Sequence, residues 1–225
     1  MDIVRIEEDY ERRKHVILLI LCILFIVRSF IDASDYFAWF MLTLPSVTLM
    51  ISLSLTYKKF RFTTFTYVMI FLHIAVLTIG AKYTYGGNPL FLNLKDIFNL
   101  NRNYYDRVGH FMQGFVPMFM VKEFILRRGY MKRSKFFYLI SIGFVLAISA
   151  TWELLEFAAT LISGKQSSYM LSTQGVLWDT QWDMVLAIIG AVLSLLIFGK
   201  LHDRKIESVK EQDVINEVLL SYKST

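Results

Sequence analysis

Six long, mostly apolar stretches recur along the chain, and short charged segments separate them. A helix that crosses a membrane needs roughly 20 mostly apolar residues, whereas a helix in a soluble core is seldom so long and apolar on every side. The pattern therefore predicts an all-α fold, a polytopic membrane helix bundle with about six transmembrane helices. The expected spans are residues 16–33, 37–56, 62–81, 107–126, 136–162 and 181–199.

The composition supports this fold class. Hydrophobic residues make up 55% of the chain and charged residues 19%, whereas soluble domains average about 45–50% and about 25%. The net charge of +5 does not indicate a nucleic-acid-binding protein, because the basic residues follow the expected membrane topology and form no single patch interleaved with aromatic residues. We expect the lipid bilayer, and no nucleic acid, as a partner.

Basic residues are distributed unevenly between the two sides of the expected bundle. Segments on one side carry 17 lysines and arginines, and those on the other side carry four, namely Lys82, Lys95, Arg102 and Lys165. Because cytoplasmic loops carry the excess of basic residues, we expect both termini in the cytoplasm. The expected layout is a cytoplasmic segment at 1–15, a transmembrane domain at 16–199 and a cytoplasmic tail at 200–225. Acidic residues precede the first span and no small-residue cleavage site follows it, so we expect an uncleaved anchor.

Three of the expected spans carry ionisable residues in pairs. Residues three or four positions apart share a helix face, and ionisable groups inside a membrane span usually face the interior of the bundle. The fourth and sixth spans begin with such pairs, and the fifth span carries one. The candidate catalytic residues, with roles unassigned, are Asp106 and His110, Glu153 and Glu156, and Asp179 and Asp183.

The expected topology places these three pairs at similar depth. The fourth and sixth spans enter from the outer side, so their first turns lie near the outer surface. The fifth span runs outward, and Glu153 lies roughly 13 Å below its end at Ile162, at 1.5 Å per residue. A tilt or an overhang of this long span brings Glu153 nearer to the level of His110. We therefore expect all six groups in the outer half of the bundle.

Five carboxylates and one imidazole at one depth repel one another unless protons, a basic partner or a metal ion neutralise them. These ligands suit a divalent ion such as Zn²⁺, Mn²⁺ or Mg²⁺, which activates water and polarises a phosphoryl or carbonyl group. A protonated carboxylate beside an ionised one is the other solution, and it suits acid–base chemistry. The candidate metal ligands are His110, Asp106, Glu153 and Asp183. The candidate substrate contacts are Gln113, Tyr83, Tyr85, Trp178 and Gln181.

Structural interpretations of the same residues stay open. Asp106 and Asp179 stand where helix caps are expected, and aspartate caps helices without any chemical role. In this interpretation His110 is a hydrogen-bond partner for a neighbouring helix. Glu153 and Glu156 then lie in a wet groove at the membrane interface.

Segments outside the polar pairs have simpler interpretations. Residues 90–100, in the long loop after the third span, are partly apolar, and we expect them to lie on the membrane surface over the polar pairs, where such loops often act as lids. The tail after Leu201 has the pattern of a charged, partly amphipathic helix. Small residues at four-residue spacing permit close helix packing, and those in the fifth and sixth spans are Gly143, Ala147, Ala187, Gly190, Ala191 and Ser194.

Six motifs in these spans carry a family resemblance: residues 80–85, 105–117, 122–123, 152–156, 173–175 and 178–184. Together they resemble the bacterial inner-membrane family typified by YjdF, whose function is unknown, over about residues 15–200. Two positions depart from the family pattern, since Lys82 stands in place of a histidine and Val176 in place of an acidic residue. The resemblance implies a multi-pass protein of the bacterial cytoplasmic membrane.

A looser similarity is to VanZ-like membrane proteins. These carry an Asp-x-x-x-His-Phe motif, then a glutamate-bearing helix, then an Asp-x-x-x-Asn helix. Here the corresponding residues are Asp106 with His110, Glu153, and Asp179 with Asp183, so an aspartate replaces the final asparagine. The similarity implies an architecture and no reaction.

Three functions are consistent with these observations. The leading hypothesis is a membrane-embedded, metal-assisted hydrolase or transferase that acts on a lipid or lipid-linked envelope substrate at the outer leaflet. The first alternative is a transporter or proton-coupled carrier that uses the carboxylates and the histidine. The second alternative is a non-catalytic membrane scaffold in which the polar residues only hold the helices together.

Overall fold

The computed structural model describes residues 2–163 and 177–221. Within these residues the chain forms seven helices and no strand, which confirms the all-α fold expected from the sequence. Lys165 and the family-motif residues 173–176 lie outside the described residues.

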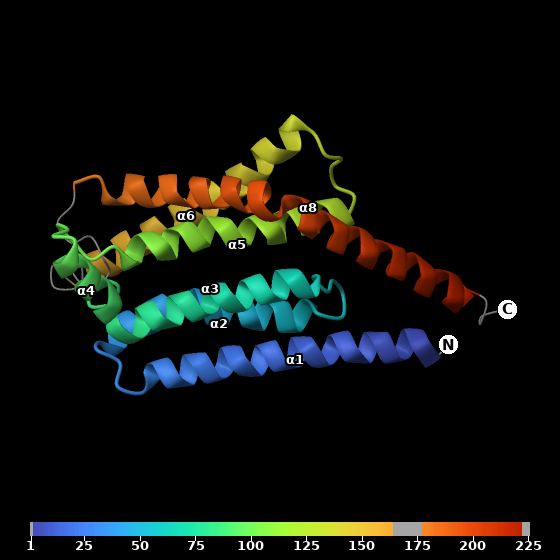
Figure 1. Ribbon diagram of the computed structural model, residues 1–225, viewed down its shortest axis with the longest axis horizontal. Coiled ribbons are helices and arrows are strands. Elements are labelled where there is room, and N and C mark those ends of the chain that lie inside the picture. The colour runs from blue at the N-terminus through green and yellow to red at the C-terminus, as the bar shows by residue number, and fades with distance from the viewer. Residues whose placement is uncertain (1, 164–176, 222–225) are drawn as a thin grey trace.

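Six long helices run roughly along one common axis, and one short helix lies at an end of the bundle (Figure 1). The short helix, α4 (Pro89–Ile97), lies at the end opposite the two termini. The long helices are α1 (Asp2–Phe30), α2 (Tyr36–Thr56), α3 (Thr64–Tyr83), α5 (Tyr105–Arg127), α6 (Lys135–Ser163) and α8 (Asp179–Ser221). Below, the end that holds α4 is called the α4 end, and the opposite one is called the terminal end.

Four helices in the described part of the chain are long and apolar enough to cross a membrane, namely α2, α3, α6 and α8. In α1 the apolar run that begins at Val16 contains Arg28 and ends with the helix at Phe30. In α5 charged residues occupy both ends of the helix. The chain is thus a polytopic helical membrane protein, and the count of six spans stays a prediction.

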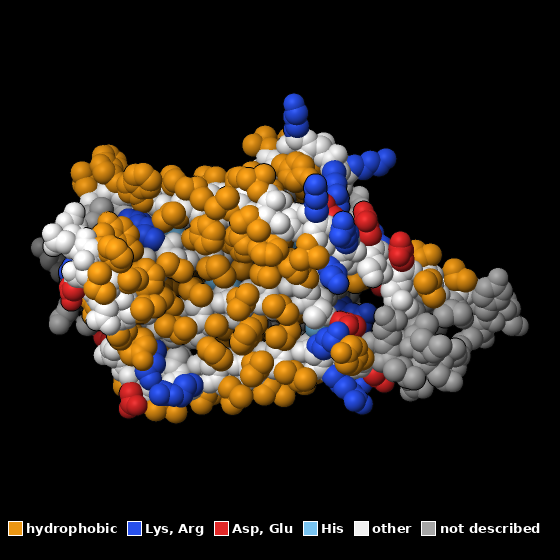
Figure 2. Space-filling model, in the orientation of Figure 1, with side chains coloured by type: hydrophobic (Ala, Val, Ile, Leu, Met, Phe, Trp, Pro, Cys, Tyr) orange, Lys and Arg blue, Asp and Glu red, His pale blue; other side chains and the backbone are white. Residues whose placement is uncertain are grey.

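The outer surface of the bundle is apolar over most of its length (Figure 2). Large apolar side chains such as Leu55, Leu139 and Leu196 are exposed on it, as expected for helices that face lipid rather than water. Lysine and arginine side chains gather toward the terminal end (Figure 2). The exposed basic residues there include Lys58, Lys59, Arg128, Lys132, Arg133, Arg204 and Lys205.

Helices α5 and α8 approach each other so closely that only glycine fits at two contacts. A Cβ atom on Gly114 would lie 1.7 Å from the backbone oxygen of Ala187, and one on Gly190 would lie 2.2 Å from the backbone oxygen of Phe111. This close contact is the packing role expected for small residues in membrane helices. It brings the first turns of α5 and α8 side by side at the α4 end.

The helix boundaries differ from the expected spans mainly at two helices. Helix α1 begins at Asp2 and so includes nearly all of the expected segment 1–15. Helix α8 continues through Gly199 to Ser221, so the expected membrane span at 181–199 and the charged tail form one continuous helix. The residues change from apolar to charged near Lys200, so the helix passes from an apolar to a polar environment there. No residue at this point has a helix propensity low enough to end the helix. Helix α8 extends beyond the other helices at the terminal end (Figure 1).

Candidate functional site

The three ionisable pairs expected from the sequence meet in one buried cluster at the α4 end. His110 Nε2 lies 3.4 Å from Asp106 Oδ1, 3.5 Å from Glu153 Oε1 and 3.8 Å from Asp183 Oδ1. Helix α5 supplies the histidine and Asp106, helix α6 supplies Glu153, and helix α8 supplies Asp183. All four side chains are buried, as are those of Glu156 and Asp179. The three helices therefore bring their polar faces together, as their spacing predicts.

Two sets of three residues in this cluster have the geometry to hold a metal ion. One set is Asp106, His110 and Asp183, and the other is His110, Glu153 and Glu156. In each set one ligand atom from every residue lies within 4.8 Å of the others. Both sets share His110, so an ion in either one would bind this histidine.

The orientation of the His110 ring leaves Nε2 directed at the carboxylates. Its Nδ1 atom lies 3.1 Å from the side-chain oxygen of Gln113, one turn further along α5. Because an amide oxygen only accepts hydrogen bonds, Nδ1 carries the hydrogen in this arrangement. A metal-binding histidine is commonly oriented by such a bond through its other ring nitrogen. Gln113 is therefore positioned to orient the His110 ring.

Four buried atoms in this cluster have no hydrogen-bond partner in the described part of the chain. They are Asp106 Oδ1, His110 Nε2, Glu153 Oε1 and Glu156 Oε1. Burial of a polar atom without a partner costs roughly 1–3 kcal/mol, and more for a charged group. The convergence of four such atoms requires bound protons, water or a cation among them.

Two arginines neutralise the other side of the cluster. Arg102 and Arg107 both donate hydrogen bonds to the carboxylate of Asp179. Arg102 also lies 3.3 Å from Asp106 Oδ2, and Arg107 donates to Asp183. Two guanidinium groups face five carboxylates, so arginine does not balance the charge of the whole cluster.

The contacts with the arginines bear on whether Asp106 and Asp179 act only as helix caps. The residue that caps α5 is Tyr104, which makes no side-chain capping bond. Asp106 lies inside the first turn, fully buried, between Arg102 and His110. Asp179 is the first residue of α8 and binds both arginines. The structure therefore shows both side chains engaged in ion pairs.

Arg102 and Arg107 are site residues that the sequence pattern did not single out, although Arg107 lies in the motif 105–117. Arg102 lies in the loop after α4 and was counted only among the basic residues of the outer side. The neighbouring Asn103 fixes this loop, because its side-chain nitrogen donates to the backbone oxygens of Gly86 and Asn88. The four-residue spacing of Arg102 and Asp106 was the available signal, but Arg102 precedes the start of α5.

The expected substrate contacts separate into two groups. Gln113 and Tyr85 are at the cluster, and the Tyr85 ring fills the space left by two glycines, Gly80 and Gly109. Of the others, Trp178 and Gln181 are exposed, and Tyr83 is half-buried at the end of α3.

An apolar cavity of about 280 Å³ adjoins His110. Helices α2, α3, α5 and α6 line it, and along α5 its lining runs from Gly109 to Val121, a distance of about 18 Å at 1.5 Å per residue. The polar residues in its lining include His110 and Gln113 at one end and His73 of α3. The cavity is therefore long and mostly apolar, and one end of it reaches the edge of the charged cluster.

A second buried polar cluster lies near the terminal end of the bundle. Glu123 of α5 accepts hydrogen bonds from the Thr63 and Thr66 hydroxyls and lies 3.2 Å from His202 of α8. Lys122 pairs with Asp203 at 2.6 Å. In the sequence Lys122 and Glu123 were identified only as a family motif, because their partners on α8, Asp203 and His202, fall in the expected tail.

Comparison with known proteins identifies the family. A family model described as predicted membrane protein (DUF2238) matches residues 14–204. The chain belongs to this family. The inner membrane protein YjdF of Escherichia coli (strain K12) is 34% identical over 183 residues, which cover 81% of this chain and 88% of that protein. No solved structure matches the chain.

Membership of this family confirms the resemblance carried by the sequence motifs. The matched residues include the whole of α5 and α6 and the first turns of α8, which together carry the cluster around His110. The name of the relative places that protein in the inner membrane.

Proposed function

We propose that the cluster around His110 binds a divalent metal ion and that the protein is a metal-assisted hydrolase or transferase acting on a lipid or lipid-linked envelope substrate. The observation that carries the proposal is the position of His110 Nε2, which faces buried oxygens of Asp106, Glu153 and Asp183 at 3.4–3.8 Å. These separations are longer than the usual 2.7–3.2 Å of a hydrogen bond. Two atoms that each bind a tetrahedral zinc ion at about 2.0–2.1 Å lie about 3.3 Å apart, which is close to the observed spacing.

The residues around the ion would have different roles. His110 would be its central ligand, joined by Asp106 and Asp183. Glu153, which faces the same ring nitrogen, would be a further ligand. Glu156 has a buried oxygen without a partner in the described residues, beside the same histidine, and it is the best placed to accept or donate a proton. The bound ion would activate a water molecule or polarise a phosphoryl or carbonyl group of the substrate.

The adjoining cavity supports a substrate with a long apolar part. Its lining is apolar over about 18 Å of α5 and becomes polar at His110 and Gln113. Ligand sites are generally largely apolar, with a few placed polar groups. An acyl or isoprenyl chain in this cavity would hold the attached polar group at the cluster.

We further propose that the cluster lies in the outer half of the inner membrane and that both termini are cytoplasmic. The basic residues at the terminal end support this orientation, because lysine and arginine are retained on the cytoplasmic side. The domain layout of a segment at 1–15, a transmembrane domain at 16–199 and a tail at 200–225 belongs to the same proposal.

The transporter alternative requires polar groups that continue across the bundle. Between the cluster at His110 and the one at Glu123, the buried residues of α5 in this structure are Gly114, Phe115, Val116, Pro117, Met118, Phe119 and Lys122. All but the last are apolar or lack a side chain, so α5 provides no polar path between the two clusters, and this favours a one-sided site.

Conversion of lipids by the purified protein tests the proposed reaction. The full chain would be reconstituted in nanodiscs of phosphatidylethanolamine and phosphatidylglycerol doped with an isoprenyl diphosphate, supplied with Zn²⁺, Mn²⁺ or Mg²⁺, and the products measured by mass spectrometry. We expect Glu156→Gln to lower the rate about 100-fold or more, the lower bound for loss of a general acid or base. The exposed Glu207→Gln variant on α8 is the matched control. Equal rates in both variants, or no conversion of any of these lipids by folded wild-type protein, would contradict the proposed function.

A further inference from the structure

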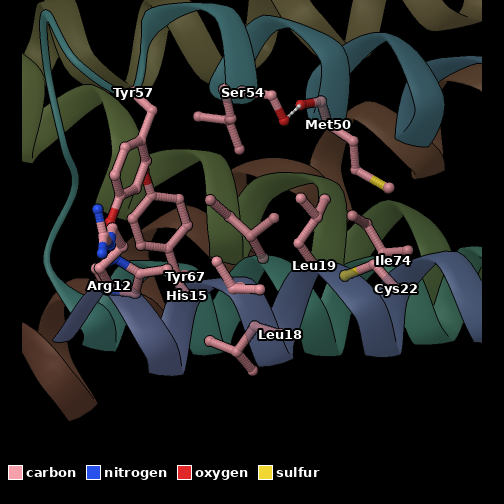
Figure 3. Close-up of a pocket in the computed structure, with 13 residues that line it drawn as sticks. Arg12, His15, Leu18, Leu19, Cys22, Met50, Ser54, Tyr57, Tyr67 and Ile74 are labelled. Atoms are coloured by element: carbon pink, nitrogen blue, oxygen red, sulfur yellow. Dashed lines mark hydrogen bonds between the residues drawn. The ribbon is translucent and has the colours of Figure 1, made fainter. Parts of the chain in front are cut away.

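The terminal end of the bundle contains an apolar cavity of about 280 Å³ between α1, α2 and α3. Figure 3 shows Arg12, His15 and Tyr57 together at one end, whereas the remainder of the lining is apolar apart from Ser54. The apolar lining comes from all three helices and includes Leu19, Cys22, Met50, Leu53, Ile70 and Ile74.

A polar cavity of about 480 Å³ lies beside the apolar one. Its lining comes from α1, from the residues just before and within the first turns of α3, and from the extension of α8. His15 lines both cavities. Arg61 of the polar cavity is also a charged neighbour of the Tyr57 hydroxyl in the apolar one. The two cavities therefore meet at His15 and Arg61.

The polar cavity carries an excess of positive charge. Lys14, Arg61 and Lys205 line it, against one carboxylate, Glu11. Glu11 is already bound to Lys14 at 2.6 Å and accepts a hydrogen bond from Thr64. Arg61 and Lys205 form no ion pair with a carboxylate among the residues that the structure describes.

His15 separates the cavities as a neutral group. Its Nδ1 lies 2.7 Å from the Tyr57 hydroxyl, and its Nε2 lies 2.7 Å from the Thr64 hydroxyl. Burial lowers the pKa of His15 to about 4, so its ring is uncharged near neutral pH. The positive charge that faces a ligand there thus comes from Arg12 in the apolar cavity and from Lys14, Arg61 and Lys205 in the polar one.

We propose that these two cavities together form a binding site for one anionic phospholipid of the surrounding membrane. The phosphate would lie beside Arg61 and Lys205, with the polar headgroup in the larger cavity and an acyl chain along Leu19 and Cys22. Lysine and arginine near the membrane surface attract anionic lipids, and the apolar cavity matches the attached chain. The site lies at the opposite end of the bundle from His110, so it is independent of the proposed function.

Lipid retention measured by native mass spectrometry tests this site. The full-length protein would be released from nanodiscs of equimolar phosphatidylglycerol and phosphatidylethanolamine, and the retained lipid identified. We expect retained phosphatidylglycerol in wild type and about 30-fold weaker retention after combined Arg61→Gln and Lys205→Gln, from the typical contribution of two basic residues. Combined Lys200→Gln and Arg204→Gln removes the same charge from exposed positions outside the cavity and should retain the lipid. Lys205→Gln alone changes one exposed side chain and keeps the test valid if the double variant unfolds.

Two further arms separate a lipid from a free anion. Leu19→Trp would fill the apolar cavity and should reduce retention, whereas Leu24→Trp on the exposed face of α1 should not. Glycerol phosphate, which has a headgroup and no acyl chain, should not displace the lipid. Equal retention of the two lipids by wild type, or displacement by glycerol phosphate, would overturn the proposal.

Discussion

Arg102 and Arg107 divide the carboxylates of the cluster into two kinds. Asp179 accepts hydrogen bonds from both arginines, so it connects α8 to α5 and to the loop that carries Arg102. Asp106 uses Oδ2 for Arg102 and directs Oδ1 at His110. The same acidic residue types therefore have different environments within one buried site, and only those directed at His110 are candidates for metal binding.

Removal of the Arg102 charge should destabilise the protein. We expect Arg102→Gln to lower the free energy of unfolding by about 3–5 kcal/mol, because the buried carboxylates of Asp179 and Asp106 then lose a positive charge that neutralises them. Thermal unfolding in mild detergent measures the effect. Lys95→Gln, in α4 of the same loop, is the matched control. A melting temperature equal to that of this control would show that Arg102 is not a structural partner.

Gln113 should affect metal affinity through His110. Gln113→Leu keeps the size of the side chain and removes the acceptor for Nδ1, so the ring is no longer held with Nε2 toward the carboxylates. Loss of such an orienting bond typically lowers metal affinity about 10–100-fold. Titration with Zn²⁺ would measure the change against Gln181→Leu, an exposed position on α8. Unchanged affinity in Gln113→Leu would contradict an orienting role.

The sequence predicted the six ionisable residues of the cluster from helical spacing alone. It did not predict Arg102 or Arg107 as members. Arg102 is a loop residue, whose direction is not fixed until the chain is folded. Arg107 is one position from Asp106 on α5, which turns its side chain by about 100° from the face that Asp106 shares with His110. Trp178 and Gln181 were expected as substrate contacts, but both side chains are exposed. A step of two residues along a helix turns a side chain by about 200°, which places Gln181 on the face opposite Asp179 and Asp183.

At the scale of the helices, the contact between α5 and α8 determines whether the cluster forms. We expect Gly190→Ala to separate these helices, because its Cβ would lie 2.2 Å from the backbone oxygen of Phe111. Gly199→Ala in the same helix meets no atom within 4 Å and should be tolerated. The melting temperature and the folded yield of the two variants provide the comparison. Equal behaviour would mean that the close contact does not exist in the membrane.

The helix limits were predictable where a polar segment adjoins an apolar one. The expected spans 37–56 and 136–162 agree within one residue at each end with α2 and α6. The continuity of α8 past Gly199 was not predictable, because hydropathy marks the edge of the membrane and not the end of a helix. The contact between Glu123 and His202 was missed for the same reason, since His202 lies beyond that edge.

At the scale of the molecule, the orientation in the membrane can be measured with cysteine labelling. Cys22 is the chain's one cysteine and is buried, so Cys22→Ala provides a clean background. We expect a membrane-impermeant thiol reagent on intact cells to label Asp96→Cys at the α4 end and not Lys210→Cys at the terminal end. Labelling of the second position alone would reverse the orientation and place the cluster on the cytoplasmic side.

The central claim, that the cluster around His110 holds a metal ion, is tested most directly by metal content. The protein would be purified in mild detergent without chelators and analysed by elemental mass spectrometry, beside His110→Ala, Glu153→Ala and His73→Ala. His73 is a buried histidine that lines the same cavity and belongs to neither ligand set. We expect near-stoichiometric Zn or Mn, or Mg if it is retained, in wild type and His73→Ala, and its loss from the folded His110→Ala and Glu153→Ala variants. Equal metal content in all four proteins, or none in wild type even after incubation with each ion, would contradict the account and favour carboxylates that share protons.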